Sequence, residues 1–120
     1  MDEIVELSGT PVLVCAADGP PVTSERDALD LIGNRGPADW IAVPVARLDP
    51  EFFRLSSGLA GDVLQKFTNY GTGLAVIGDV AALTAASEPL AALVRESNRG
   101  RRHWFLPDLD ALTGRLAASS

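Results

Sequence analysis

Four short apolar runs, separated by longer amphipathic stretches, limit this chain to a small set of folds. They lie at residues 12–15, 40–45, 74–77 and 103–106. Each run is too short for a buried helix, and its continuous apolar character predicts a strand that is covered on both faces. Strands that alternate with helices are typical of an α/β protein with a mostly parallel sheet. We therefore expect the α/β fold class.

The two ends of the chain refine this prediction. Residues 3–7 alternate polar and apolar side chains, and the turn sequence at residues 8–11 joins them to the first apolar run as a hairpin. The hairpin gives the sheet an antiparallel edge. The expected order is β-β-α-β-α-β-α-β-α, a single layer of mostly parallel mixed sheet packed with helices, with residues 1–120 forming one domain. Its helices are predicted near residues 24–36, 56–71, 87–100 and 107–117, with a short helical turn at 49–53.

The composition excludes several classes of protein. A chain of 120 residues with 47% hydrophobic residues is long enough to bury one core. Its single Cys and single His exclude a disulfide scaffold and a structural zinc site, so we expect no metal and no cofactor. The formal charge is −6, and residues 1–66 carry all of it. An acidic surface argues against binding to nucleic acid, which needs Lys and Arg to replace the counterions of phosphates.

The distribution of apolar residues also bears on the location of the protein. No apolar run approaches the length of a membrane span, and the sequence starts with acidic residues where a signal peptide carries basic ones. We therefore expect a cytoplasmic protein without a membrane partner.

The segment at residues 55–61 carries most of the functional signal. Ser56 and Ser57 stand at the start of a predicted helix and are followed by Gly58 and Leu59. The free amide groups and the dipole at a helix N-terminus favour an anion, so a phosphate attached to Ser57 would be stabilised there. The simpler interpretation is that one of the serines is only an N-cap.

The element order and the sequence Ser56-Ser57-Gly58-Leu59 resemble the STAS family, small domains named for sulphate transporters and bacterial anti-sigma factor antagonists. The resemblance covers the architecture of nearly the whole chain, and the sequence match covers residues 55–67. In antagonists of that family, a kinase phosphorylates a serine in a D-S/T-S-G motif at this helix start, and phosphorylation breaks the complex. The resemblance implies Ser57 as the phosphorylation site, with Ser56 as a second candidate, although Leu55 replaces the aspartate of the motif.

A longer pattern resembles an uncharacterised bacterial domain-of-unknown-function family, which we regard as STAS-like. The resemblance supports the fold more than it supports a function. The pattern comprises Phe52-Phe53, residues 58–61 and 64–67, Asn69-Tyr70, Ile77-Gly78-Asp79 and Glu96-Ser97-Asn98.

These observations predict a non-enzymatic regulatory module that binds another protein through the face around residues 49–66. A regulatory kinase or an anti-sigma-like factor is the expected partner, and a homodimer is the other expected assembly. Because Phe52 and Phe53 are adjacent, one of them is a candidate for an exposed apolar patch. The candidate contact residues are Phe52, Phe53, Gly58, Leu59 and Asp62.

A basic cluster near the C-terminus supports an alternative function. Arg99, Arg101, Arg102 and His103 could hold a phosphate or a carboxylate through bidentate contacts, which would make the protein a small-anion binder or a minor enzyme. The simpler interpretation is a helix C-terminus at which cations interact favourably with the helix dipole.

Other catalytic arrangements fail on position. A Ser–His–Asp triad would need His103 as its base, but His103 begins a strand whereas Ser57 follows one, so the two should lie at opposite edges of the sheet. The alternative of a small-molecule binder or minor enzyme could also use loop carboxylates gathered at one edge of the sheet around Mg²⁺, although scattered loop acids are usually solvated. These carboxylates are Asp49, Glu51, Asp79 and Asp108. We therefore expect no catalytic residues.

Overall fold

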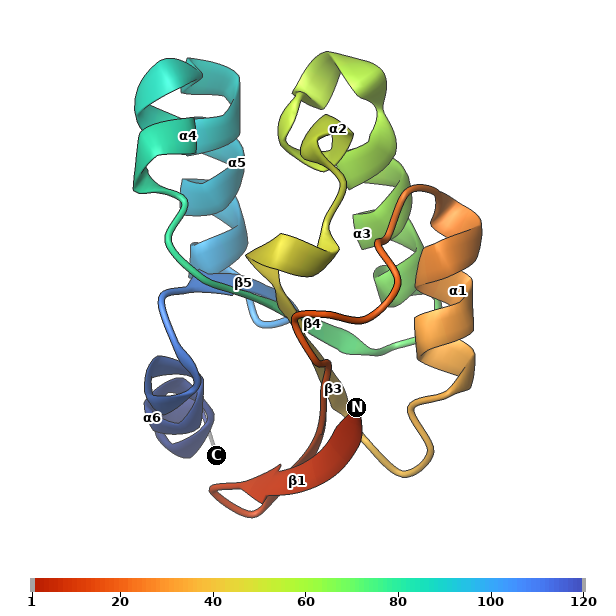
Figure 1. The fold of residues 1–120 in the computed structure, drawn as a ribbon. Helices are drawn as coiled ribbons and strands as arrows, with labels where there is room; N and C mark the ends of the chain where they lie inside the picture. The colour runs from red at the N-terminus through yellow and green to blue at the C-terminus, as the bar shows by residue number, and fades with distance from the viewer. Residues whose placement is uncertain (1, 120) are drawn as a thin grey trace.

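The structure, a computed structural model, describes residues 2–119 and contains one five-stranded sheet (Figure 1). The strands lie side by side in the order β1-β2-β3-β4-β5. β1 pairs antiparallel with β2, and every other neighbouring pair is parallel. The prediction of an α/β fold with a mostly parallel mixed sheet is confirmed. The strands are β1 (Glu3–Leu7), β2 (Thr10–Val14), β3 (Trp40–Pro44), β4 (Gly73–Ile77) and β5 (His103–Leu106).

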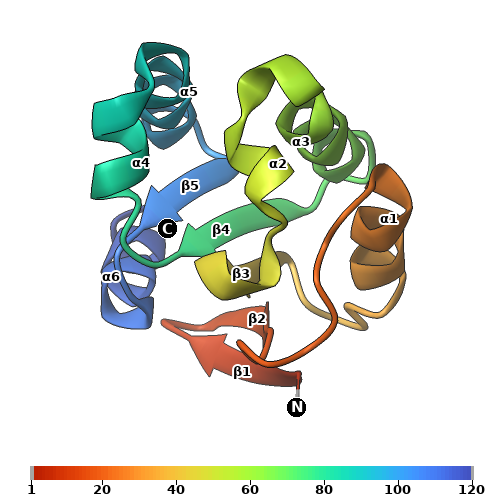
Figure 2. The ribbon, with the colours of Figure 1, turned by 45° about the horizontal axis from the view of Figure 1, so that its top comes forward.

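Helices cover both faces of the sheet. Three long helices, α1 (Glu25–Gly33), α3 (Leu59–Asn69) and α5 (Glu88–Arg99), lie on one face, and α6 (Leu109–Ser119) lies on the other (Figures 1 and 2). Short helical segments follow the ends of β3 and β4, and all of them lie at the same edge of the sheet (Figure 2). These segments are η1 (Val45–Arg47), α2 (Pro50–Phe53), η2 (Leu55–Ser57) and α4 (Ala81–Ala86).

Local sequence signals account for most helix boundaries. Ser24 caps α1 by accepting a hydrogen bond from the Asp27 amide, and Asp27 in turn accepts one from the Thr23 amide at 2.8 Å. Ser87 caps α5 in the same way, through the Leu90 amide. Helix α4 was not predicted, because it has no side-chain cap and its six residues carry one large apolar side chain, Leu83.

Two apolar cores lie on opposite faces of the sheet. The larger core packs the apolar faces of α1, α3 and α5 against Ile41, Val43, Leu74 and Val76 of the central strands. The smaller core lies under α6 and includes the side chains of the central strands that point the other way. The smaller core consists of Val12, Trp40, Ala42, Ala75, Trp104, Leu112 and Leu116. The continuous apolar character of the strands follows from this burial on both faces.

A pair of tryptophans spans the sheet beneath α6. Trp40 on β3 and Trp104 on β5 stack with ring centroids 4.3 Å apart, although β4 lies between their strands. Gly73 on β4 is paired with Trp40, and a Cβ atom at this position would overlap the Trp40 ring. The glycine therefore makes room for one indole to lie flat over the middle strand.

The outer edge of β5 is closed by a side chain. The Asn98 amide of α5 donates to the Phe105 carbonyl at 3.2 Å and accepts from the Phe105 amide at 2.7 Å. Asn98 therefore replaces a neighbouring strand for this residue. Arg115 of α6 donates to the Asn98 carbonyl and lies over the Trp104 ring, 4.5 Å from its centroid.

A buried arginine connects the start of the chain with the end of β3. Arg47, whose side chain is 4% exposed, donates through Nε to the Pro20 carbonyl at 2.6 Å and through Nη1 to the Ala16 carbonyl at 2.9 Å. The same Nη1 forms an ion pair with Asp2 at 3.0 Å. A side chain at Gly19 would overlap the Arg47 guanidinium, so this loop residue must be small.

The charges at this site determine the pKa values of two neighbours. Burial raises the pKa of Asp2, but the hydrogen bond from the Ala16 amide and the nearby Arg47 guanidinium outweigh it, so that the pKa lies below its ordinary value. Burial and the Asp2 carboxylate raise the pKa of the Cys15 thiol to about 12. The Cys15 sulfur is therefore a buried neutral thiol at physiological pH.

The tryptophan stack leads to a first expectation. Gly73→Ala should destabilise the protein by about 1–3 kcal/mol, because the added methyl group displaces the Trp40 ring in a packed core. Urea denaturation measures this change. Gly114→Ala is the control: it lies within α6 with no atom near its added Cβ, and we expect it to stabilise by about 0.5–1 kcal/mol. Equal effects of the two substitutions would contradict this account.

The Asp2–Arg47 pair leads to a second expectation. Because the pKa of Asp2 is lowered in the folded state, its contribution to stability is complete above the ordinary value of 3.8 and is lost as the pH falls through the folded value. Asp2→Asn should therefore reduce the loss of unfolding free energy between about pH 5 and pH 2. Chemical denaturation at several pH values tests this, with Glu3→Gln as an exposed control. An unchanged pH slope in Asp2→Asn would refute it.

Candidate binding groove

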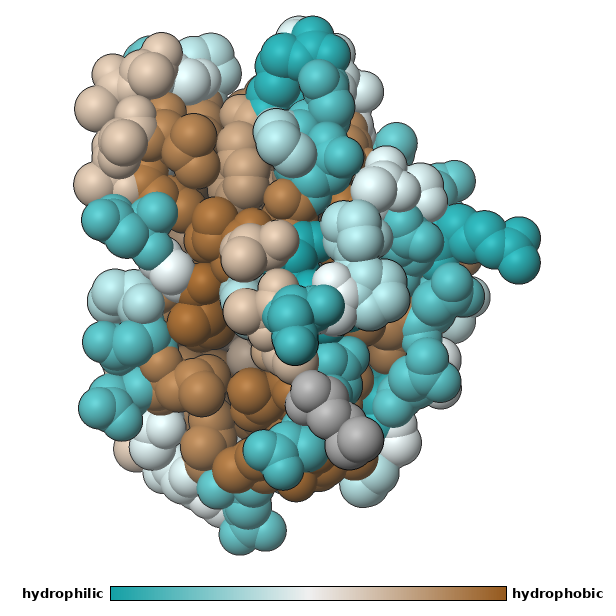
Figure 3. Space-filling view, viewed as in Figure 1, coloured by the Kyte–Doolittle hydropathy of each residue, from teal (hydrophilic) through white to brown (hydrophobic). Residues whose placement is uncertain are grey.

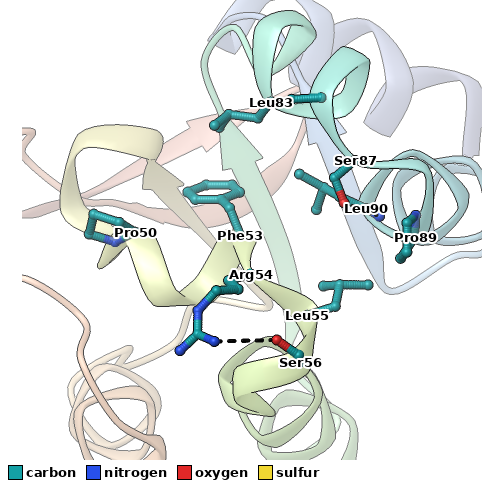
Figure 4. A pocket seen from close by; sticks show the side chains of 10 residues that line it. Pro50, Phe53, Arg54, Leu55, Ser56, Leu83, Ser87, Pro89 and Leu90 are labelled. Carbon is teal, nitrogen blue, oxygen red and sulfur yellow. Dashed lines mark hydrogen bonds between the residues drawn. The ribbon is translucent and has the colours of Figure 1, made fainter.

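An apolar groove lies between the helical segments at the carboxyl edge of the sheet. A hollow of about 420 Å³ separates α2 and η2 on one side from α4 and α5 on the other (Figure 4). A second hollow of about 370 Å³ shares Pro50, Phe53 and Leu83 with the first, so the two form one groove. We call it the edge groove. Its lining residues are Val45, Ala46, Leu48, Pro50, Phe53, Arg54, Leu55, Ser56, Leu83, Ala86, Ser87, Pro89 and Leu90.

The edge groove follows from the topology. Parallel strands end at the same edge of a sheet, and the connections that leave them collect there. η1 and α2 leave β3, and α4 leaves β4, so their apolar side chains face one another across the gap. The space-filling view shows apolar surface between α4 and α2 (Figure 3). Leu83 is 38% exposed and contributes to this apolar surface.

The two adjacent phenylalanines both point inward. Phe52 is completely buried and lies 6.5 Å from the Phe105 ring, in the core between the sheet and α3. Phe53 is 9% exposed, packs edge to face against Phe52 and lines the edge groove (Figure 4). Leu59 is also buried in the core. Of these three predicted contact residues, Phe53 is the one that lines the edge groove.

Neither serine caps helix α3, so that prediction is wrong. The N-cap residue is Gly58, which adopts a left-handed conformation with φ of 82° and offers no side chain. Ser57 instead donates its hydroxyl to the Glu51 carbonyl at 2.6 Å and accepts a hydrogen bond from the Leu59 amide at 3.2 Å. These bonds fix η2 against α2.

The two serine side chains face different surroundings. Ser56 lines the edge groove and accepts a hydrogen bond from Arg54 Nη1 at 3.4 Å (Figure 4). Ser57 lines a separate hollow together with the acidic side chains of Glu25, Glu51 and Asp62. Glu51 forms an ion pair with Arg54, and the hydrogen bonds of this pair raise the pKa of Arg54.

The basic residues that were predicted to form an anion site have separate neighbours. Arg99 pairs with Glu96 at 3.0 Å, and the Arg102 guanidinium lies near Gly71. Arg101 lines a hollow of about 450 Å³ beside the two tryptophans. His103 Nε2 lies 3.3 Å from the Thr68 hydroxyl. Within residues 2–119, these four side chains therefore contact different groups and do not form one site.

His103 and Ser57, which were predicted to lie at opposite edges of the sheet, lie at opposite ends of α3. Ser57 precedes the first turn, whereas His103 contacts Thr68 in the last turn, and eleven helical residues span about 16 Å. Burial and the neighbouring Arg102 lower the pKa of His103. The distance excludes a direct Ser57–His103 pair.

Residues 2–119 contain neither a metal-binding cluster nor a membrane-spanning helix. No three His, Cys, Asp or Glu side chains of this part of the chain gather in a way that could hold a metal ion, and Asp49, Glu51 and Asp79 are included in that finding. No helix in the same part is long and apolar enough to cross a membrane.

One wall of the edge groove was missed by the sequence interpretation. Leu83 lies in the unpredicted helix α4, whereas Pro89 and Leu90 lie at the start of α5, a predicted helix for which no motif indicated a place in a groove. The signal that could have found them is Leu83 itself, a large apolar residue among alanines directly after a central strand.

The fold and the groove define an α/β protein with a mostly parallel sheet and an apolar site at its carboxyl edge. The model of the family described as "Domain of unknown function (DUF4180)" matches residues 7–116, and the chain belongs to this family. The prediction of an uncharacterised domain-of-unknown-function family is thereby confirmed. Comparisons with curated proteins and with solved structures gave no match.

The turn before α3 leads to a third expectation. Gly58→Ala should destabilise the protein by about 1–2 kcal/mol, because the left-handed conformation crowds a Cβ atom against the backbone. Gly61→Ala is the matched control inside α3: nothing lies near its added Cβ, so we expect a gain of about 0.5–1 kcal/mol. Urea denaturation measures the free energy of unfolding of both variants. A loss of stability in Gly61→Ala as large as that in Gly58→Ala would contradict the special role of the left-handed Gly58.

Proposed function

We propose that the protein is a non-enzymatic regulatory module that binds another protein through the edge groove. The observation that carries this proposal is the continuous apolar lining of two joined hollows, about 420 and 370 Å³, at the edge of the sheet where α/β proteins bind ligands. Burial of such a surface by a partner is favourable because it removes apolar area from water. The STAS resemblance of the sequence and the face predicted around residues 49–66 support the same proposal.

We further propose that phosphorylation of Ser57 weakens partner binding. A kinase would transfer the γ-phosphoryl group of ATP to Ser57 Oγ, forming the new P–O bond as the bond to the β–γ bridging oxygen breaks, with release of ADP and of the hydroxyl proton. The modified oxygen can no longer donate to the Glu51 carbonyl, and the new charge meets Glu25, Glu51 and Asp62. The lost hydrogen bond releases η2 from α2, and the repulsion between the charges moves the two segments apart. Because η2 carries Leu55 and Ser56 of the groove wall, the shape of the groove would change.

Small-anion binding by residues 99–103 receives less support. Arg99 is already paired with Glu96, and His103 is half-buried beside Thr68, where burial and Arg102 lower its pKa and so disfavour the charged form that would bind an anion. Arg101 beside the tryptophan hollow is the residue that would have to carry this alternative.

Affinity capture from a lysate of the protein's own cells tests the docking function. Leu83→Arg should lose the captured partner, since burying an uncompensated charge costs about 3–5 kcal/mol, more than a hundredfold in affinity. Leu83 is exposed, so the variant should fold, and thermal denaturation verifies this. Tyr70→Arg places the same group on an exposed aromatic outside the groove and should capture the partner normally. Equal capture by both variants would refute the proposal.

Phosphosite mapping by mass spectrometry tests the switch. We expect phosphate on Ser57 after co-expression with kinases of the same genome. Ser57→Glu should weaken capture more than Ser57→Ala, because the alanine variant loses the same hydrogen bond without adding charge. An unmodified Ser57, together with wild-type capture by Ser57→Glu, would remove the switch and leave the docking function standing.

A further inference from the structure

The geometry of the edge groove points to its occupant: we infer that the groove binds an amphipathic helix of the partner, with Lys or Arg beside its apolar face. This inference rests on the proposed docking function and names the chemistry of the partner. It follows from the shape of the groove, from the state of the nearby strand edge and from the charges around the groove.

The shape of the groove suits a helix. Its walls are helical, with the short segments α2 and η2 on one side and α4 and the start of the longer helix α5 on the other (Figure 4). The two hollows share Pro50, Phe53 and Leu83 and so adjoin each other, and adjoining apolar hollows suit the successive apolar side chains that a helix presents at i, i+3, i+4 and i+7.

An added strand is a poor alternative. Strand addition needs free backbone groups along a sheet edge. At the edge of β5, behind α5, the Asn98 amide already satisfies the amide and the carbonyl of Phe105. The lining residues of the groove belong to η1, α2, η2, α4, α5 and the residues between them, and to no strand.

The charge around the groove is negative. Glu51 and Glu88 are balanced by ion pairs with Arg54 and Arg95. Asp49 and Asp79 form no ion pair with the described residues. A partner with basic side chains would balance these two carboxylates.

Asp49 and Asp79 are also fixed in place. Asp49 accepts a hydrogen bond from the Glu51 amide at 2.8 Å, and Asp79 accepts one from the Ala81 amide at 2.8 Å. Asp49 lies between Leu48 and Pro50 of the lining. Asp79 follows Gly78, whose backbone packs against the lining residue Val45. Both residues therefore adjoin the η1 end of the groove without belonging to its lining, and held carboxylates lose less side-chain entropy on pairing.

Fluorescence anisotropy with two labelled helical peptides tests the inference. Both peptides carry the same leucine row, and one has Lys and the other Glu beside it. The Lys peptide should bind wild-type protein about two- to thirtyfold more tightly, the worth of two exposed ion pairs. High salt should shrink this difference. Asp49→Asn/Asp79→Asn should remove most of it while keeping the N-cap of α2 and the Asp79–Ala81 hydrogen bond, since the side-chain oxygen of asparagine accepts the same backbone hydrogen bonds.

The outcomes separate this inference from the docking function. The inference that the partner helix is basic is refuted by any of three results: equal binding of the two peptides, tighter binding of the Glu peptide, or an unchanged preference in Asp49→Asn/Asp79→Asn. Failure of both peptides, while Leu83→Arg still loses the captured partner, overturns the helix and keeps docking. A dimer in light scattering that Leu83→Arg dissociates assigns the groove to a second copy and also overturns it. If Leu83→Arg leaves capture unchanged, the docking function itself fails.

Discussion

The buried guanidinium of Arg47 is the interaction on which the arrangement of this fold most depends. It connects the loop after β2, the start of the chain and the end of β3 through bonds to Pro20, Ala16 and Asp2. A buried charge is tolerated only when its donors find partners, and the described chain has no buried side-chain polar atom without one. The neighbouring backbone continues the connection, since Val22 donates to the Arg47 carbonyl and accepts from the Asp49 amide.

The hydrogen bonds of Arg47 determine the position of one wall of the edge groove. η1 begins directly after β3, and its last residue is Arg47, so the side chain turned inward fixes the segment whose other residues line the groove. The wall on the other side depends on α4 and α5, which are held by packing and by the Ser87 cap. The wall that includes η1 is thus fixed by the buried bonds of Arg47 as well as by packing, whereas the α4–α5 wall depends on packing and one cap. We expect the second wall to adjust more readily to a partner.

The fold could be predicted from the sequence because strands and helix starts are marked by residues that are close together in the chain. Strand sequences such as residues 74–77 are apolar throughout. Ser24 and Ser87 are N-caps whose side chains accept hydrogen bonds from amides three residues further on. The groove was not readable, because its walls meet only through the sheet topology. Ser57 shows the same limit: its position before a helix resembles an N-cap, but the left-handed Gly58 turns the chain and sends its hydroxyl to Glu51. Arg47 gave no signal, since a lone arginine after a strand is usually exposed.

The Asn98 side chain has a consequence for how copies of this protein can meet. Fibres built by sheet extension need two usable edges on every molecule, one to receive and one to offer backbone groups. At β5 the amide of Asn98 takes the place of the incoming strand on Phe105. The opposite edge, β1, carries Glu3 and Glu6, which repel an identical strand. Extension of the sheet from one molecule to the next can therefore go no further than a dimer. This disfavours the growth of filaments by the folded protein at high concentration.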